Sequence, residues 1–162
     1  MSNKTSRINK LFLVIVLLFV PFELFAKMIP LSSNHFTWYP TEGTSLPKGA
    51  DVEVLYSDKT CGHYAIRVRG NMGYKIPKHY YDGDEHILIL NGSVELIEYG
   101  AHGAKKNERS ETVLNQGQFK AVKSKQVQAL DFLDDNTIVE LHLHGGDNIY
   151  YIHEKDDPRL KQ

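Results

Sequence analysis

Three side chains that could carry chemistry follow one another near the middle of the chain: the imidazole of His79, the phenol of Tyr81 and the carboxyl of Glu85. Side chains alternate between the two faces of a strand, and these three positions share the same parity. All three can therefore point to one side of an extended segment, with Gly83 between them allowing a tight turn. Such a group can coordinate a metal ion or hydrogen-bond to a small organic molecule.

The residues around this group form short runs of alternating character, separated by glycine, asparagine, aspartate and lysine. No amphipathic helix longer than a turn or two is expected. Strands of this length and spacing are typical of an all-β sandwich or barrel. Nine strands are predicted, at residues 35–39, 51–56, 64–69, 86–90, 93–99, 118–122, 126–131, 137–144 and 149–152.

Two connections are predicted to be hairpins. Asn91-Gly92 lies between two apolar runs, and both central residues of a type I′ turn need a positive φ. The polar stretch 101–110 is expected to be an exposed hairpin loop. The run 87–90 is apolar on both faces, so one face can fill a core while the other needs a cover, such as a second strand layer or a partner subunit. This pattern favours a homodimer.

The first 26 residues have the pattern of a secretory signal peptide. Lys4, Arg7 and Lys10 form a basic region, residues 11–20 are an unbroken apolar run, and cleavage is expected after Ala26. The alternative is an uncleaved membrane anchor. A spanning helix needs ~20 apolar residues, which is longer than this run.

Residues 27–162 are therefore expected to form one exported domain, periplasmic if the source is a Gram-negative bacterium and secreted otherwise. Cleavage would change the formal charge from −1 to −3, because three basic residues and one acidic residue leave with the signal peptide. This charge gives no basic surface for nucleic acid. The membrane is expected as a partner only through the signal peptide before cleavage. Cys61 is the only cysteine, so an intramolecular disulfide is impossible.

The segment around the three chemical side chains resembles the first cupin motif, G-x5-H-x-H-x3/4-E-x6-G. It runs Gly73-x5-His79-x-Tyr81-x3-Glu85-x6-Gly92, with Tyr81 in place of the second histidine. The chain is similar to single-domain cupins related to the zinc-binding cupin domain of certain anti-sigma factors. The resemblance extends over about residues 46–159 and implies a jelly-roll barrel of the double-stranded β-helix type, with His79, Tyr81 and Glu85 at the family's metal-ligand positions. The other matching pieces are 46–50, Arg67, 76–79, 84–86, 117–119, His142, 149–152 and 156–159.

The second cupin motif, G-x5-P-x-G-x2-H-x3-N, is where the chain departs from the family. Starting from Gly117, Lys123 replaces the proline, Lys125 the glycine, Gln128 the histidine and Phe132 the asparagine. The resemblance therefore implies a fourth ligand position at Gln128, so two of the family's four ligands are changed.

This ligand set leaves the cofactor open. One imidazole, one phenol, one carboxylate and one amide make a poor zinc site, because zinc prefers imidazole and thiolate. Ferric iron could offset the cost of ionising Tyr81, which is about 4 kcal/mol near pH 7, and manganese would tolerate the oxygen ligands. The candidates are thus iron, manganese, zinc or no metal, the last with a neutral Tyr81 and Gln128 hydrogen-bonded to each other, to water or to an organic ligand.

His142 matches a family position and is a candidate ligand-binding or general-base residue if it faces the barrel mouth. It shares a strand face with Glu140 and His144, so the alternative is an ordinary solvated polar face.

Three functions are compatible with these residues. The first is a small-molecule-binding barrel with a degenerate metal site formed by His79, Tyr81, Glu85 and Gln128. The second is a metal-dependent oxygenase or isomerase in which His79, Tyr81 and Glu85 hold the metal. The third is a sensor or interaction module, which the family resemblance permits but for which fold analogy is a weak warrant.

Overall fold

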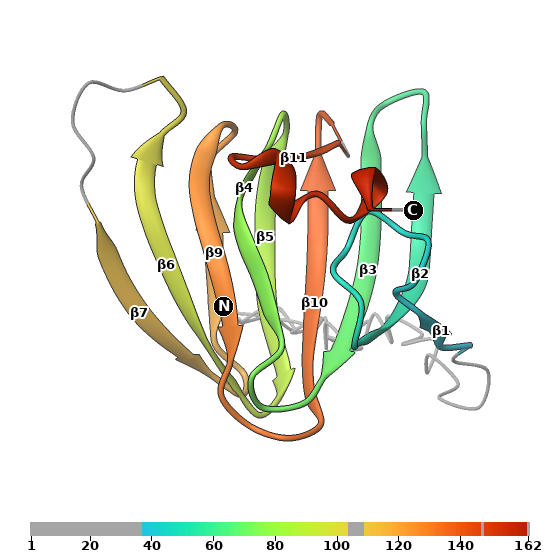
Figure 1. Cartoon of the computed structure of the whole chain (residues 1–162), viewed down its shortest axis with the longest axis vertical. Helices are drawn as coiled ribbons and strands as arrows, with labels where there is room; N and C mark the ends of the chain where they lie inside the picture. The colour runs from blue at the N-terminus through green and yellow to red at the C-terminus, as the bar shows by residue number, and fades with distance from the viewer. Residues whose placement is uncertain (1–36, 104–108, 147, 162) are drawn as a thin grey trace, which may run out of the picture. The chain divides into compact units, whose positions relative to one another are not determined.

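The computed structural model describes residues 37–103, 109–146 and 148–161, all within one unit, Asn34–Gln162. Strands dominate this part of the chain, and two short 3-10 helices, η2 (Glu154–Asp156) and η3 (Pro158–Leu160), follow the last strand (Figure 1). The predicted all-β class is confirmed. The predicted signal peptide lies outside the described residues and stays a prediction. Within the described ranges, no helix has the length and apolar character needed to cross a membrane.

The strands form two sheets, which we call sheet A and sheet B (Figure 1). Sheet A contains, in spatial order, β1 (Tyr39–Pro40), β2 (Asp51–Asp58), β3 (His63–Gly70), β10 (Thr137–His144), β5 (Asp84–Asn91) and β8 (Phe119–Val122). Sheet B contains β11 (Ile149–Tyr151), β4 (Lys75–Tyr81), β9 (Gln126–Phe132), β6 (Ser93–Ala101) and β7 (Ser110–Asn115). All pairs are antiparallel.

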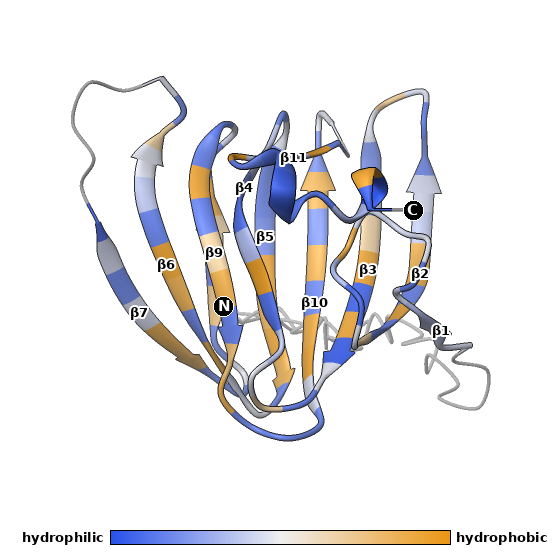
Figure 2. Ribbon diagram, viewed as in Figure 1, coloured by the Kyte–Doolittle hydropathy of each residue, from blue (hydrophilic) through white to orange (hydrophobic). Residues whose placement is uncertain are grey.

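The core lies between the inner faces of the two sheets. Bands of hydrophobic and hydrophilic residues alternate along β3 and β6 (Figure 2), and on β10 every second residue is buried. The same buried cluster contains Val68 and Ile87 from sheet A and Leu96 and Phe132 from sheet B. Burial of one face of each sheet against the other is the expected source of stability for a domain without disulfides.

Two strands were missed by the sequence prediction, and each lacks a clear alternation. β7 is exposed at every residue but Leu114, as suits the edge of a sheet, so it carries almost no hydrophobic pattern. β4 contains Pro77, and its pairing with β9 is irregular between Ile76 and His79. The irregularity shifts the buried positions from even to odd numbers along this strand.

The connection at Asn91-Gly92 is a corner rather than the predicted hairpin. β5 pairs with β10 and β8 in sheet A, whereas β6 pairs with β7 and β9 in sheet B. Gly92 does have the positive φ expected of such a turn, at 72°. The other predicted hairpin is confirmed, since β6 and β7 are paired, although part of its loop, residues 104–108, lies outside the described residues.

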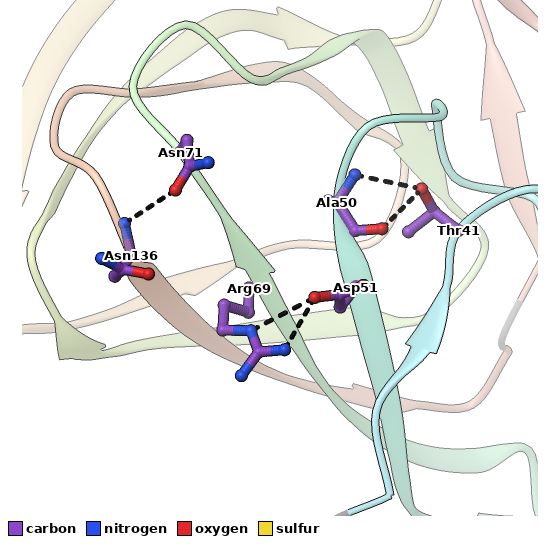
Figure 3. Close-up of polar contacts among 6 residues, drawn as sticks. All are labelled: Thr41, Ala50, Asp51, Arg69, Asn71 and Asn136. Atoms are coloured by element: carbon purple, nitrogen blue, oxygen red, sulfur yellow. Dashed lines mark hydrogen bonds and ion pairs between the residues drawn. The ribbon is translucent and has the colours of Figure 1, made fainter.

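Residues 41–50, between β1 and β2, fold back on themselves and are held by hydrogen bonds to backbone atoms. Thr41 is fully buried, and its Oγ1 lies 2.7 Å from Pro47 O. The same Oγ1 lies 3.1 Å from Ala50 O (Figure 3). Two tyrosines add to this, because Tyr74 Oη donates to Pro47 O at 2.9 Å and Tyr151 Oη donates to Ser45 O at 2.8 Å. We call residues 41–50 the mouth segment.

Polar contacts also fix the chain on either side of the mouth segment. At the start of β2, Arg69 Nη2 lies 2.7 Å from Asp51 Oδ2, and the backbone N–H of Asn136 donates to Asn71 Oδ1 at 3.1 Å (Figure 3). The second contact ties the loop after β3 to the loop before β10. These two contacts join the strands and loops next to the mouth segment to one another.

Gly83 and Gly117 allow a test of the corner between β4 and β5. A Cβ on Gly83 would overlap the carbonyl oxygen of His144 and come within 2.8 Å of the Gly146 backbone, whereas a Cβ on Gly117 would meet nothing within 4 Å. We expect Gly83→Ala to lower the free energy of unfolding by about 3 kcal/mol through overpacking. Gly117→Ala should cost only about 1 kcal/mol, because its φ is positive. Urea unfolding of both variants measures this, and equal losses would contradict the steric argument.

Candidate functional site

Four side chains that the sequence analysis grouped as candidate ligands are buried together between the sheets. His79, Glu85 and Gln128 are each 1% exposed and Tyr81 is 5% exposed. His79 and Tyr81 lie at the end of β4, Gln128 lies beside His79 in the pairing of β4 with β9, and Glu85 comes from β5 in the other sheet. The structure therefore brings together the four residues that the sequence analysis grouped.

His79 is held as a neutral imidazole. Its Nδ1 lies 2.7 Å from Pro77 O, and because a carbonyl can only accept, Nδ1 carries the proton. Burial lowers the pKa of His79 to about 4, with the Pro77 carbonyl acting in the opposite direction. The Nε2 lone pair is thus available as an acceptor or a metal ligand.

Glu85 and Gln128 form a half-satisfied pair. Gln128 Nε2 donates to Glu85 Oε2, but Glu85 Oε1 and Gln128 Oε1 are buried without a hydrogen-bond partner. Burial raises the pKa of Glu85 to about 7, and the hydrogen bond from Gln128 opposes this rise. Each unpartnered buried oxygen costs about 1–3 kcal/mol, so a donor or a cation placed here would be stabilising.

Tyr81 is a neutral phenol at the wall of a small cavity. Burial, and then the nearby Glu85 carboxyl, raise its pKa well above the usual value. Its ring packs edge-on against His79, with centroids 5.3 Å apart. The cavity has a volume of about 100 Å³, room for about three water molecules. Its other walls are Thr44, Ser45, Leu46, Val52, Val54, Tyr64, Ile66 and Leu143.

Leu46 lines both this cavity and a larger groove. Leu46 is 4% exposed, and the groove has a volume of about 410 Å³. Pro47 and Pro77 also line the groove, which reaches Asp156 and Pro158 in the two short helices. The mouth segment thus contributes Thr44, Ser45 and Leu46 to the cavity, and Leu46 also lines the groove.

The donor set fits a hard ion better than zinc. The available donors are one imidazole nitrogen on His79, the two unpartnered oxygens of Glu85 and Gln128, and a phenol oxygen on Tyr81 that must first lose its proton. Hard divalent or trivalent ions accept such oxygen-rich sets, whereas zinc prefers nitrogen and sulfur. Across the described ranges, no three or more His, Cys, Asp or Glu side chains are arranged around a metal position.

His142 lies apart from the other four predicted site residues. On β10 the inward side chains are Val139, Leu141 and Leu143, so His142 points to the outer face. There Glu140 Oε1 lies 2.7 Å from its Nε2, and 42% of the side chain is exposed. The expectation that His142 faces the barrel mouth is therefore wrong. The alternative, a polar face shared with Glu140 and His144, matches the geometry because alternation along the strand turns all three outward.

Two features of the site were not identified from the sequence. Tyr64 lines the cavity from β3, and Leu46 lines it from the mouth segment. The stretch 46–50 does match the family pattern, so a signal was present. Its place beside the cavity could not be read from a single sequence, because the contact joins residues far apart along the chain.

Comparison with known proteins supports the architecture alone. No protein-family model and no curated protein matches the chain. Among solved structures, KdgF from Halomonas sp. is similar with a TM-score of 0.55 at 13% identity, covering 69% of this chain and 88% of that one. The DMSP lyase DddQ from Ruegeria pomeroyi DSS-3 has a TM-score of 0.55 at 16% identity, covering 72% of this chain and 61% of that one. A variant of oxalate decarboxylase from Bacillus subtilis has a TM-score of 0.56 at 14% identity, covering 73% of this chain and 34% of that one.

Identities this low establish a shared fold rather than a shared family or activity. Together with the two facing antiparallel sheets, these neighbours show that the chain folds as a cupin β-barrel.

Proposed function

We propose that the protein is an exported binding barrel for a small molecule, which passes the mouth segment and hydrogen-bonds to Tyr81. One observation carries this proposal: a cavity ends at Tyr81, close to a buried Glu85–Gln128 pair that has two unpartnered oxygens. Glu85 and Gln128 do not line the cavity, so a ligand would have to extend a hydrogen-bond donor past Tyr81 to pair with one of their unpartnered oxygens, which are costly to leave without a partner. The mainly aliphatic walls of the cavity favour a small apolar body with one or two polar groups.

A metal-dependent enzyme of the oxygenase or isomerase type is the second candidate. The same two oxygens, with Nε2 of His79, favour it, because a cation would satisfy them as well as a donor would. Glu85, Gln128 and His79 would hold the ion, and Tyr81 would join them only on losing its proton. A bound ion would supply Lewis-acid polarisation of a substrate oxygen.

Ligand binding is tested by removing one hydroxyl. The purified protein is screened by thermal shift against small alcohols, amides and carboxylic acids, and hits are titrated calorimetrically. We expect Tyr81→Phe to weaken binding of any hit about ten-fold, because one hydrogen bond contributes about 1.5 kcal/mol. The matched control is Tyr39→Phe, which removes the same hydroxyl from an exposed ring. Hits that bind Tyr81→Phe as tightly as the wild type would place the ligand elsewhere.

Elemental analysis separates the two candidate functions. The protein is exported natively, purified without chelator and dialysed, beside His79→Ala and the control His153→Ala, whose histidine is exposed. The binding-barrel proposal predicts that the wild type carries no more transition metal per chain than His79→Ala does. One metal per chain that is lost in His79→Ala and kept in His153→Ala would instead favour the enzyme candidate. With iron, a visible tyrosinate charge-transfer band lost in Tyr81→Phe would identify the phenol as a ligand.

The raised pKa of Glu85 predicts a pH dependence of stability. The folded state binds this proton more tightly than the unfolded chain, whose carboxyl has the ordinary pKa of 4.5. The carboxyl therefore destabilises the fold progressively as the pH rises from 4.5 to about 7, and fully above that. His79 has the opposite effect, because its pKa is lowered from 6.5 to about 4. The folded state loses stability as the pH falls from 6.5 to about 4.

Glu85→Gln isolates the carboxyl. We expect the free energy of unfolding of the variant, relative to that of the wild type, to be about 2–3 kcal/mol higher at pH 8 than at pH 5. Urea unfolding at the two pH values measures this difference. Glu95→Gln makes the same chemical change at a half-buried position of β6 and is the matched control. If the free energy of unfolding of Glu85→Gln changed with pH as that of the wild type does, the Glu85 carboxyl would already be ionised in the folded state at pH 5.

A further inference from the structure

The outer face of sheet A carries a cluster of histidines that the candidate site does not use. Four of the eight histidines in the sequence lie on three adjacent strands. His63 on β3 pairs with His144 on β10, and His142 on β10 pairs with His86 on β5. We call these four residues the outer histidine cluster.

One row of this cluster runs straight across four strands. The register aligns, in order from β2 to β5, Asp58, His63, His144 and Asp84. Residues directly opposite each other in an antiparallel pair have Cβ atoms ~5 Å apart, so their side chains are in reach of one another. His144 is therefore flanked within its row by an imidazole on one side and a carboxylate on the other.

The ring separations match those of imidazoles that share one metal ion. The ring centroids of His63 and His144 are 4.9 Å apart, and those of His86 and His144 are 5.1 Å apart. With a metal–nitrogen distance of ~2.0 Å, two rings on one ion have centroids ~4.5 Å apart at a right angle and ~5.2 Å apart at a tetrahedral angle. Both pairs fall within this interval, and His144 is the ring common to both.

The surroundings of His144 suit a ligand. Partial burial and then the neighbouring imidazoles lower the pKa of His144, so the ring is neutral near pH 7, the form that binds metal. Asp84 is ionised, because hydrogen bonds from Lys123 and from the backbone N–H of Ser124 lower its pKa. His86 is steadied by the ring of Phe119, with centroids 5.3 Å apart.

We propose that His144, together with His63 or His86, binds a late divalent transition metal, Cu²⁺, Ni²⁺ or Zn²⁺, on the outer face of sheet A. As the rings stand, no three of these donors surround one position in the described structure, so the site is a two-imidazole chelate with water in its open positions. His63 and His144 are exposed, and exposed rings change rotamer within nanoseconds, so they can turn towards an ion. The buried side chains of the same strands, such as Leu141 and Leu143, lie between this outer site and the interior site at His79.

Copper titration tests the proposal. Cu²⁺ is added to the purified, chelator-treated protein, and binding is followed by equilibrium dialysis and by electron paramagnetic resonance, which reports nitrogen ligands. We expect one Cu²⁺ per chain at this site, with the affinity at least about ten-fold lower in His144→Gln. His63→Gln and His86→Gln should each have a smaller effect, because each removes one of two alternative partners. His153→Gln, which removes an exposed histidine outside the cluster, should bind as the wild type does.

The outcomes separate this site from the interior one. Circular dichroism first confirms that each variant is folded. Unchanged Cu²⁺ affinity in both His144→Gln and the double variant His63→Gln/His86→Gln would overturn the proposal, as would the absence of nitrogen ligands in the wild-type spectrum. Loss of the ion in His79→Ala, with His144→Gln unaffected, would assign it to the interior instead.

Discussion

Gly83 lies where β4 leaves sheet B and β5 enters sheet A, and backbone atoms of His144 and Gly146 occupy the space that a side chain would need. This close approach brings Glu85, from one sheet, next to Gln128, from the other. Without the corner, His79 and Tyr81 would share a wall with Gln128 but would have no carboxyl beside them. The candidate site, its buried pair and the cavity at Tyr81 all depend on this corner.

Burial keeps the interior group largely uncharged. His79 is neutral, Tyr81 keeps its proton, and the pKa of Glu85 is raised to about 7. A network of neutral groups avoids the cost of an unpaired charge in a low-dielectric interior, but it must then satisfy every donor and acceptor. The two free oxygens are where that requirement fails, and they are the features that a ligand, a water molecule or an ion can use.

The fold class, and the grouping of four of the five candidate site residues in one place, could be predicted from the sequence, because strand alternation and motif spacing are local properties. The corner at Asn91-Gly92 could not, since the same two-residue turn with positive φ serves both a hairpin and a change of sheet. The pairing partners of β5 and β6 decide between them. β7 gave no signal because an edge strand needs no buried face. His142 was ambiguous because a single strand does not reveal which of its faces is the inner one.

The mouth segment is attached mainly through its backbone. Tyr74 and Tyr151 donate to the carbonyls of Pro47 and Ser45, and any residue provides a carbonyl. Most side chains in residues 42–49 could thus change over evolutionary time while the segment keeps its place. Three side chains of the mouth segment are exceptions: Thr41 and Thr44 hydrogen-bond to its backbone, and Leu46 lines both spaces. Related barrels could therefore acquire new ligands by exchanging residues in the mouth segment while the strands that support it stay the same.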